Sequence, residues 1–94
     1  MKLAWTMRAE HHLRAAYRYW SREKPEAAAD LMLERILSTV DLLEHNPGMG
    51  RPGRLASTRE LVLNPLPFVL TYRFHRDKIE IVALLHGARK WPEQ

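Results

Sequence analysis

The stretch FVLTYRFHRDKIEIVALLH, residues 68–86, decides the fold of this 94-residue chain. Its first part, residues 68–75, repeats with a period of two, which is the period of a β-strand. Residues 79–86 form a second apolar run of strand length, and the polar triplet 76–78 between them predicts a turn. The side chains that share one face of the first strand are Phe68, Leu70, Tyr72 and Phe74, and those of the other face are Val69, Thr71, Arg73 and His75.

The second strand, Ile79–His86, is apolar on both faces. Simple alternation places Val82 and Leu84 on one face and Ile81, Ala83 and Leu85 on the other. A strand with two apolar faces is expected at the centre of a sheet, where helices cover at least one face.

Working back along the chain, Arg59–Leu63 predicts another strand, and residues 64–67 break it. The preceding segment, residues 46–54, holds three glycines and two prolines. We expect it to exclude regular structure and to need positive φ at Gly48, Gly50 or Gly53.

The N-terminal half is helical after a short strand at Lys2–Thr6. One helix is expected from Met7 to Arg22 and a second from Pro25 to Glu44, with Pro25 in the first helical position. The stripes that we expect to be buried are Ala9, Leu13, Ala16, Tyr17 and Trp20 in the first helix, and Ala29, Leu33, Ile36, Leu37, Val40 and Leu43 in the second.

These elements together predict an α+β fold in a single domain, residues 1–94. An N-terminal strand is followed by an antiparallel helix hairpin, and a three-stranded antiparallel meander completes one sheet. Trp5 and Trp20 are expected to pack in its core.

Composition excludes several classes of protein. The chain has no cysteine, which rules out disulfides and thiolate metal sites, and no apolar run approaches the roughly 18 residues of a membrane span. We expect a cytoplasmic protein with no membrane association. The net charge is +4. Residues 1–45 balance seven basic against seven acidic side chains, whereas residues 46–94 hold eight against four, so the excess suits a polyanionic or acidic partner.

Neither a metal site nor a cofactor is expected. His11 and His12 are adjacent, so on a helix they diverge by about 100°, and the other histidines fall in separate elements. No phosphate-binding loop pattern is present.

Four short motifs in order resemble the RelE/ParE toxin superfamily, and most closely its ParE branch of plasmid stabilisation proteins. They are residues 46–54, residues 58–61 (TREL), residues 67–73 (PFVLTYR) and residues 85–92 (LHGARKWP). The order of strand, helix hairpin and meander is also that of this superfamily, and the resemblance covers nearly the whole chain.

The resemblance implies a toxin of a type II toxin–antitoxin system that a small antitoxin neutralises. ParE-like members bind and poison DNA gyrase, whereas RelE-like members are ribosome-dependent mRNA endonucleases. The two branches share a fold, so the fold does not separate them. We expect gyrase poisoning, with RelE-like mRNA cleavage on a basic sheet face as the alternative.

Under the endonuclease alternative, the catalytic candidates are His86, Arg59 and Arg73, because a metal-independent ribonuclease needs a proton-transfer group and cations around the phosphate. Arg51 and Arg54 are candidates for binding nucleic acid beside them. Two structural roles compete with this interpretation. His86 could bond to a carbonyl group at a strand end, and the arginines could pair across strands with Glu60 or Glu80.

The antitoxin of a ParE-like toxin is expected to be acidic and partly disordered, and to wrap around the helix hairpin in a hetero-oligomer. Its candidate contacts are Leu31, Met32 and Leu42, which lie off the main stripe of the second helix, together with Arg89 and Trp91 near the C-terminus. The competing role for the three helix residues is in the core of the hairpin itself.

Overall fold

The computed structural model describes residues 2–87. Seven elements follow one another along the chain: β1 (Lys2–Trp5), α1 (Met7–Glu23), α2 (Ala28–His45), β2 (Arg51–Pro52), β3 (Arg59–Val62), β4 (Phe68–His75) and β5 (Lys78–His86). The expected α+β order of strand, helix hairpin and meander is therefore confirmed. In the part of the chain so described, neither helix is long and apolar enough to cross a membrane.

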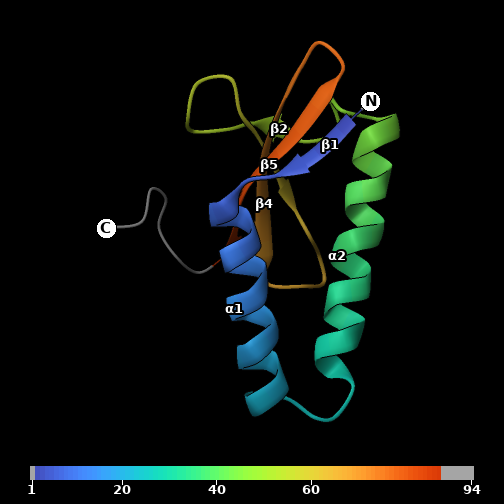
Figure 1. The fold of residues 1–94 in the computed structure, drawn as a ribbon, viewed down its shortest axis with the longest axis vertical. Helices are drawn as coiled ribbons and strands as arrows, with labels where there is room; N and C mark the ends of the chain where they lie inside the picture. Colours follow the sequence, from blue (N-terminus) through green and yellow to red (C-terminus); the bar gives the residue numbers. More distant parts are fainter. Residues whose placement is uncertain (1, 88–94) are drawn as a thin grey trace.

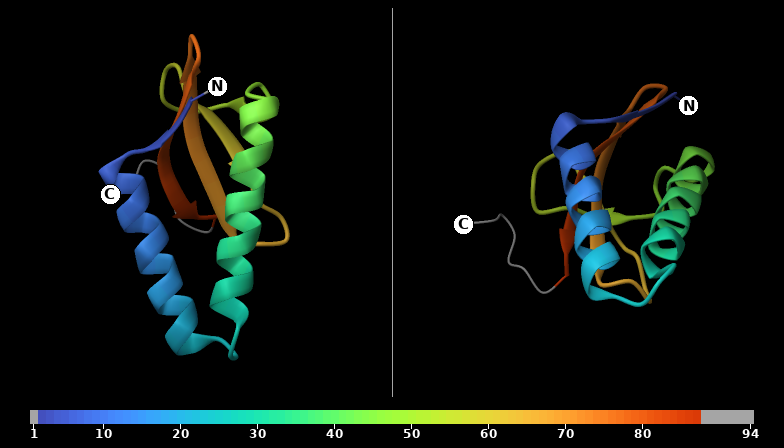
Figure 2. Two further views of the ribbon diagram at one scale, coloured as in Figure 1. Left: turned by 45° about the vertical axis from the view of Figure 1, so that its right-hand side comes forward. Right: turned by 60° about the horizontal axis from the view of Figure 1, so that its bottom comes forward.

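All five strands form one mixed sheet in the order β1-β5-β4-β3-β2. β1 pairs with β5 in parallel, and every other pair is antiparallel. The parallel pair is possible because the helix hairpin lies between its two strands in the sequence. Both helices cover the same face of the sheet (Figures 1 and 2). We call this the helix face, and the opposite side the outer face.

The β4–β5 hairpin forms the centre of the sheet. The bounds predicted for its first strand are confirmed. Its turn is shorter than expected. Lys78 belongs to β5 and pairs with His75, which leaves only Arg76 and Asp77 in the turn. Such a tight turn needs positive φ, and Arg76 adopts a φ of 58°.

The alternation predicted for the second strand is wrong, because β5 contains a bulge. Thr71 pairs with Ala83, but the next residue of β4, Tyr72, pairs with Ile81, so Val82 has no partner across the hairpin. One extra residue reverses the faces beyond it. Ile81 and Leu84 therefore both join the core cluster.

The start of α1 agrees with the prediction, whereas the start of α2 does not. The Thr6 hydroxyl caps α1 by accepting a hydrogen bond from the Ala9 nitrogen at 3.0 Å. We expected Pro25 at the first position of α2, but the helix begins at Ala28. A residue before proline is pushed towards extended backbone, and Lys24 is extended, so Pro25 is used to turn the chain.

The core lies between α2 and the helix face of the sheet. Ile36, Val40 and Leu43 are buried as predicted, whereas Leu37 is exposed and Leu33 is half-buried. Met32 takes the place expected for Leu33, since positions 32, 36, 40 and 43 form one continuous seam of the helix. Trp5 and Trp20 pack against this core while remaining partly exposed.

The glycine- and proline-rich segment differs from its prediction in two respects. Arg51 and Pro52 form the short edge strand β2, which pairs with β3. Among residues 2–87 no glycine has positive φ, and the non-glycine residues that do are Ala27, Ser57 and Arg76. Gly50 and Gly53 are needed for close approach to neighbouring residues rather than for positive φ, whereas nothing lies within 4 Å of a Cβ atom at Gly48.

Candidate functional site

Tyr72 fixes the segment after α2 to the middle of the sheet. Its side chain is completely buried on the helix face, and its hydroxyl donates a hydrogen bond to the Pro47 carbonyl oxygen at 2.8 Å. The same hydroxyl accepts one from the Gly50 nitrogen, also at 2.8 Å. Burial raises the pKa of Tyr72 above its ordinary value, although the Gly50 N–H and the positive charge of Arg59 oppose the rise.

Arg59 lies directly opposite Tyr72 in the β3–β4 pair and supports the same segment. Its Nη1 donates a hydrogen bond to the Gly50 carbonyl oxygen at 2.7 Å. Its guanidinium also lies 5.7 Å from the centre of the Phe74 ring, which is within cation–π range. Arg59 therefore has a structural role in holding the chain before β2.

Gly50 is the position where these contacts meet. A Cβ atom there would lie 2.8 Å from the Glu60 carbonyl oxygen and 2.9 Å from the Tyr72 ring. Only glycine allows the two strands and the ring to come so close. The sequence pointed to Gly50 only as a position for positive φ, which it does not adopt, and to Tyr72 only as one residue of a strand face. A tyrosine on the core face needs a partner for its hydroxyl, and that requirement was the available signal.

Arg73 projects to the outer face, because alternation along β4 separates it from Tyr72. It pairs across the hairpin with Glu80, and its Nε lies 2.7 Å from a carboxylate oxygen of that residue. The cross-strand ion pair considered for Arg73 is thus confirmed. The register puts Arg59 on the helix face, so the two arginines do not share one face as the endonuclease alternative required.

His86 lies at the far end of the hairpin. It pairs with Phe68, five residues along β4 from Arg73, which corresponds to about 16 Å of strand. Its ring meets the Phe68 ring edge-on, with the centroids 6.0 Å apart. The three candidate catalytic side chains are therefore not brought together.

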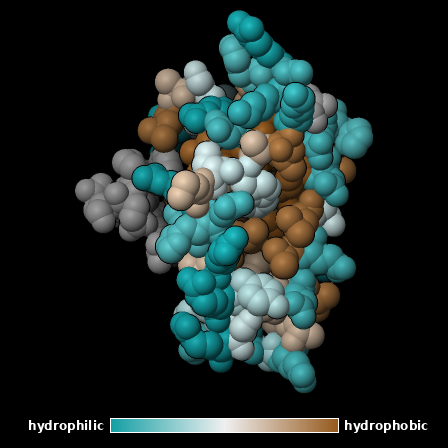
Figure 3. Space-filling view, viewed as in Figure 1, coloured by the Kyte–Doolittle hydropathy of each residue, from teal (hydrophilic) through white to brown (hydrophobic). Residues whose placement is uncertain are grey.

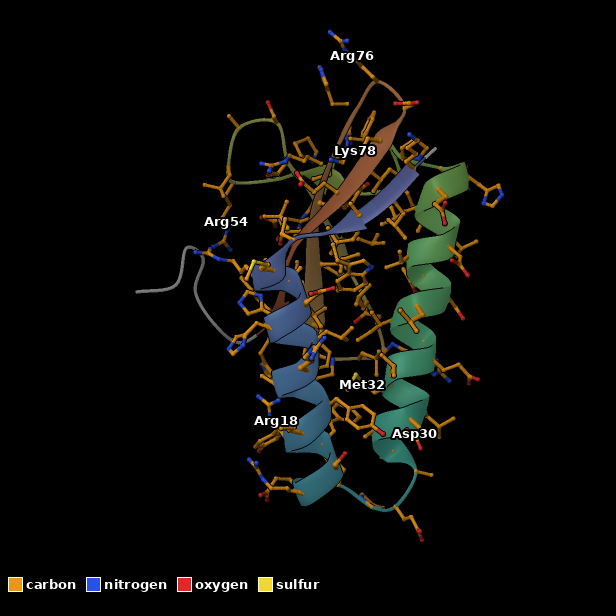
Figure 4. All side chains as sticks on the ribbon, in the orientation of Figure 1. Arg18, Asp30, Met32, Arg54, Arg76 and Lys78 are labelled. Carbon is orange, nitrogen blue, oxygen red and sulfur yellow. The ribbon has the colours of Figure 1, made fainter. Side chains whose placement is uncertain are left out.

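Arg51 and Arg54 gather around Glu60 on the outer face. Glu60 is 6% exposed although it is a carboxylate, and it lies opposite Thr71. One of its oxygens lies 3.4 Å from Arg51, and the other accepts a hydrogen bond from the Arg54 backbone nitrogen at 3.2 Å. This ion pair partly neutralises Arg51. Figure 4 labels Arg54 beside the loop that carries it.

An apolar groove runs between the two helices, on the side away from the sheet. Figure 3 shows hydrophobic side chains gathered between α1 and α2. Part of it is a hollow of about 340 Å³ lined by Leu13, Arg14, Tyr17, Arg18 and Leu33. Leu31 and Leu42 are 57% and 54% exposed, as expected for residues outside the core.

Met32 and Tyr17 lie where α2 and α1 face each other. Met32 is 1% exposed, so our expectation that it lies off the buried stripe is wrong. Tyr17 donates a hydrogen bond of 2.6 Å to the Asp30 carboxylate across the hairpin. This hydrogen bond, together with the charge of Asp30, raises the pKa of Tyr17. Figure 4 shows Asp30 and Met32 on α2 facing α1, which carries Arg18.

A family model described as the ParE toxin of the type II toxin-antitoxin system parDE matches residues 3–91. The chain belongs to the ParE toxin family. The relative "Putative toxin Y4kP" of Sinorhizobium fredii is 41% identical over 92 residues, which cover 98% of this chain and 94% of that protein.

Solved structures agree with this ParE assignment. A structure described as the chromosomal ParDE system from P. aeruginosa superposes with a TM-score of 0.82 at 28% identity, covering 92% of this chain and 95% of the other. A YoeB/ParE toxin from Agrobacterium tumefaciens gives 0.61 at 20% identity, with coverages of 92% and 98%, and shows the shared fold.

Membership of the ParE family makes the chain the toxin half of a parDE pair, whose cognate partner is a ParD antitoxin. Two of the residues expected to contact that partner, Arg89 and Trp91, lie outside the described residues. Within residues 2–87 of this ParE toxin, no group of three histidine or acidic side chains could hold a metal ion.

Proposed function

We propose that this ParE toxin acts in the cytoplasm by binding and poisoning DNA gyrase, and that a ParD antitoxin neutralises it by covering the helix hairpin. The observation that carries the first part is the separation of Arg59, Arg73 and His86. Membership of the ParE family supports the same choice. The proposal treats the chain as a binding module rather than an enzyme.

Chemistry explains why this separation matters. Cleaving RNA without a metal requires a base, an acid and cations within hydrogen-bond reach of one phosphate, about 3 Å. Here Arg59 is bonded to Gly50 on the helix face, Arg73 to Glu80 on the outer face, and His86 lies about 16 Å of strand away. No single phosphate could contact all three without rearrangement of the sheet.

The groove between the helices supports the second part. An amphipathic or extended antitoxin segment that follows the groove and continues over α2 would also bury Leu31 and Leu42, large apolar side chains that the fold leaves exposed outside the hollow. Arg14 and Arg18 line the same groove, so an acidic segment would find opposite charge beside the apolar surface. A disordered antitoxin can bury a large contact area in this way, and the contacts offset the conformational entropy that it loses on becoming ordered.

Purified toxin, purified gyrase and negatively supercoiled plasmid test the proposal. We expect linear DNA to accumulate after protein denaturation, because a poison traps the cleaved intermediate, and we expect prior addition of the antitoxin to abolish it. The variants Arg73→Ala and His86→Ala should retain this activity. If the toxin leaves purified gyrase unaffected but cleaves mRNA when it is added to a translation extract, the endonuclease alternative would be supported instead.

A further inference from the structure

A row of basic side chains crosses the outer face at the tip of the β4–β5 hairpin. Lys78 pairs with Lys2 of β1 on one side and with His75 of β4 on the other. Residues paired directly across strands project from the same face, and neighbouring strands lie about 4.8 Å apart. Arg76, at the turn, extends the row beyond the end of the sheet (Figure 4). We call these four residues the tip row.

Like charges placed opposite one another destabilise a sheet, so the tip row needs an explanation. All four side chains are exposed, and within residues 2–87 no ion pair joins any of them to an acid. The nearest acidic residues along the hairpin are Asp77 in the turn and Glu80, which is already paired with Arg73. The fold therefore concentrates unneutralised positive charge at one end.

The composition of the tip row favours a phosphate backbone over a protein surface. Interfaces between proteins are built on apolar and aromatic anchors, and lysine is depleted from them. The tip row has no apolar member, and Phe74 in the adjacent position points to the helix face, where Arg59 lies over its ring. Contacts that only position a protein on nucleic acid use lysine and arginine on phosphates.

The tip row also lies on the face of the sheet opposite the helix hairpin. A hollow of about 590 Å³ beside it is lined by residues of both faces, among them Arg73 and His75 of the outer face and Arg59 and Phe74 of the helix face. Neither this hollow nor the tip row includes a residue of the groove between the helices. A ligand on the tip row would therefore leave the antitoxin groove open.

We infer that the tip row, Lys2, His75, Arg76 and Lys78, is a binding surface for the phosphate backbone of duplex DNA. None of its four residues is a phenylalanine, tyrosine or tryptophan, and the imidazole of His75 is its one aromatic ring, so stacking platforms are few, which favours a duplex over a single strand. The choice of DNA over RNA rests on the proposed function, since gyrase holds duplex DNA. The contact would place the toxin against DNA that gyrase has bound.

Fluorescence anisotropy with the full-length toxin and a labelled duplex of about 20 base pairs tests this inference without gyrase. If Lys2, Arg76 and Lys78 each neutralise one phosphate, binding should weaken about 40-fold between about 50 and 200 mM KCl. Arg76→Gln with Lys78→Gln should lower the slope of log K against log salt by about 1.8 and weaken binding more than about tenfold at 50 mM. The circular dichroism spectrum of this double variant should match that of the wild type.

The control carries the same loss of charge elsewhere: Arg8→Gln with Arg35→Gln, on the exposed surfaces of α1 and α2. Equal weakening by this control would overturn the inference, because net charge alone would then explain binding. Tighter binding to duplex RNA than to DNA would also overturn it, as would a tip variant that binds DNA normally but no longer binds DNA-free gyrase. Each result is independent of whether gyrase is poisoned.

Discussion

The hydroxyl oxygen of Tyr72 lies 2.8 Å from the backbone nitrogen of Gly50, and this contact joins the centre of the sheet to the segment that follows α2. The hydroxyl also donates to the Pro47 carbonyl oxygen, so a single side chain satisfies two backbone groups. Arg59 bonds to the carbonyl group of the same glycine. The edge of the sheet where β2 and β3 pair thus depends on one buried tyrosine.

Replacing Tyr72 with phenylalanine tests this dependence. We expect Tyr72→Phe to lower the free energy of unfolding by about 1–3 kcal/mol, because the Gly50 N–H and the Pro47 carbonyl oxygen lose their partner. In a domain of this size, each kcal/mol lowers Tm by about 4–8 °C. Thermal and urea unfolding measure the change. The exposed Tyr19 provides the control, since Tyr19→Phe should stay within about 0.5 kcal/mol, and equal stability of the two variants would contradict the account.

Two glycines five residues or fewer from the end of α2 should respond oppositely to alanine. Gly50→Ala should destabilise the protein by about 1–3 kcal/mol, because the new Cβ atom would lie 2.8 Å from the Glu60 carbonyl oxygen. At Gly48 nothing lies within 4 Å and φ is not positive, so Gly48→Ala should be neutral or stabilise by up to about 1 kcal/mol. Urea denaturation of both variants checks the order, and a destabilised Gly48→Ala beside a stable Gly50→Ala would contradict it.

Alkaline pH should reveal the buried state of Tyr72. Burial raises its pKa in the folded protein above the ordinary value of 10.0, so the neutral phenol is favoured by folding. The corresponding stability is fully present below pH 10.0 and is lost as pH rises through the higher folded pKa. The difference in free energy of unfolding between wild type and Tyr72→Phe should therefore begin to shrink above pH 10.0. Urea unfolding at a series of pH values measures it, and a constant difference would show that Tyr72 ionises no less readily when folded.

Much of the fold could be predicted because local patterns agree with tertiary demands. The alternation of residues 68–75 gave the bounds of β4, and the four buried residues Ala29, Ile36, Val40 and Leu43 follow from helical periodicity. The bulge at Val82 could not be predicted, because nothing in an apolar run marks the residue that lacks a cross-strand partner. Its effect was to reverse the expected faces of β5.

The candidate site was harder to predict, because it depends on register. Arg59 and Arg73 look alike in the sequence, but pairing Arg59 with Tyr72 separates the two arginines by one position and so by one face of the sheet. The early start assumed for α2 followed from reading Pro25 as a helical residue. Met32 was misplaced because positions 32 and 33 both fit a helical stripe, and only packing decides between them.

Adjacent residues of α2 should separate antitoxin binding from stability. Leu31→Glu should leave the free energy of unfolding within about 0.5 kcal/mol, because the side chain is 57% exposed. It should weaken antitoxin binding at least tenfold, about 1.4 kcal/mol, by placing an acid on the exposed apolar surface of α2 that the antitoxin is proposed to cover. Met32→Ala should instead cost about 2–5 kcal/mol of stability. Calorimetric titration and urea unfolding measure the two effects.

The exposed Ala56, in the loop between β2 and β3, supplies the matched control for the added charge, since Ala56→Glu lies outside the helix hairpin and should bind antitoxin normally. Undiminished antitoxin binding by Leu31→Glu would show that the antitoxin occupies another surface. Loss of binding by Ala56→Glu to the same degree would show that acidity of the toxin, rather than the apolar surface of the hairpin, controls the affinity.

Expression of this toxin alone in bacterial cells, with DNA damage signalling and transcript integrity followed over the first minutes, tests the central claim most directly. Gyrase poisoning predicts DNA breaks and filamentous growth while transcripts remain intact, for the wild type and equally for Arg73→Ala and His86→Ala. Cleavage of transcripts within translated frames before any DNA damage, lost in those two variants, would contradict the claim and establish the endonuclease instead.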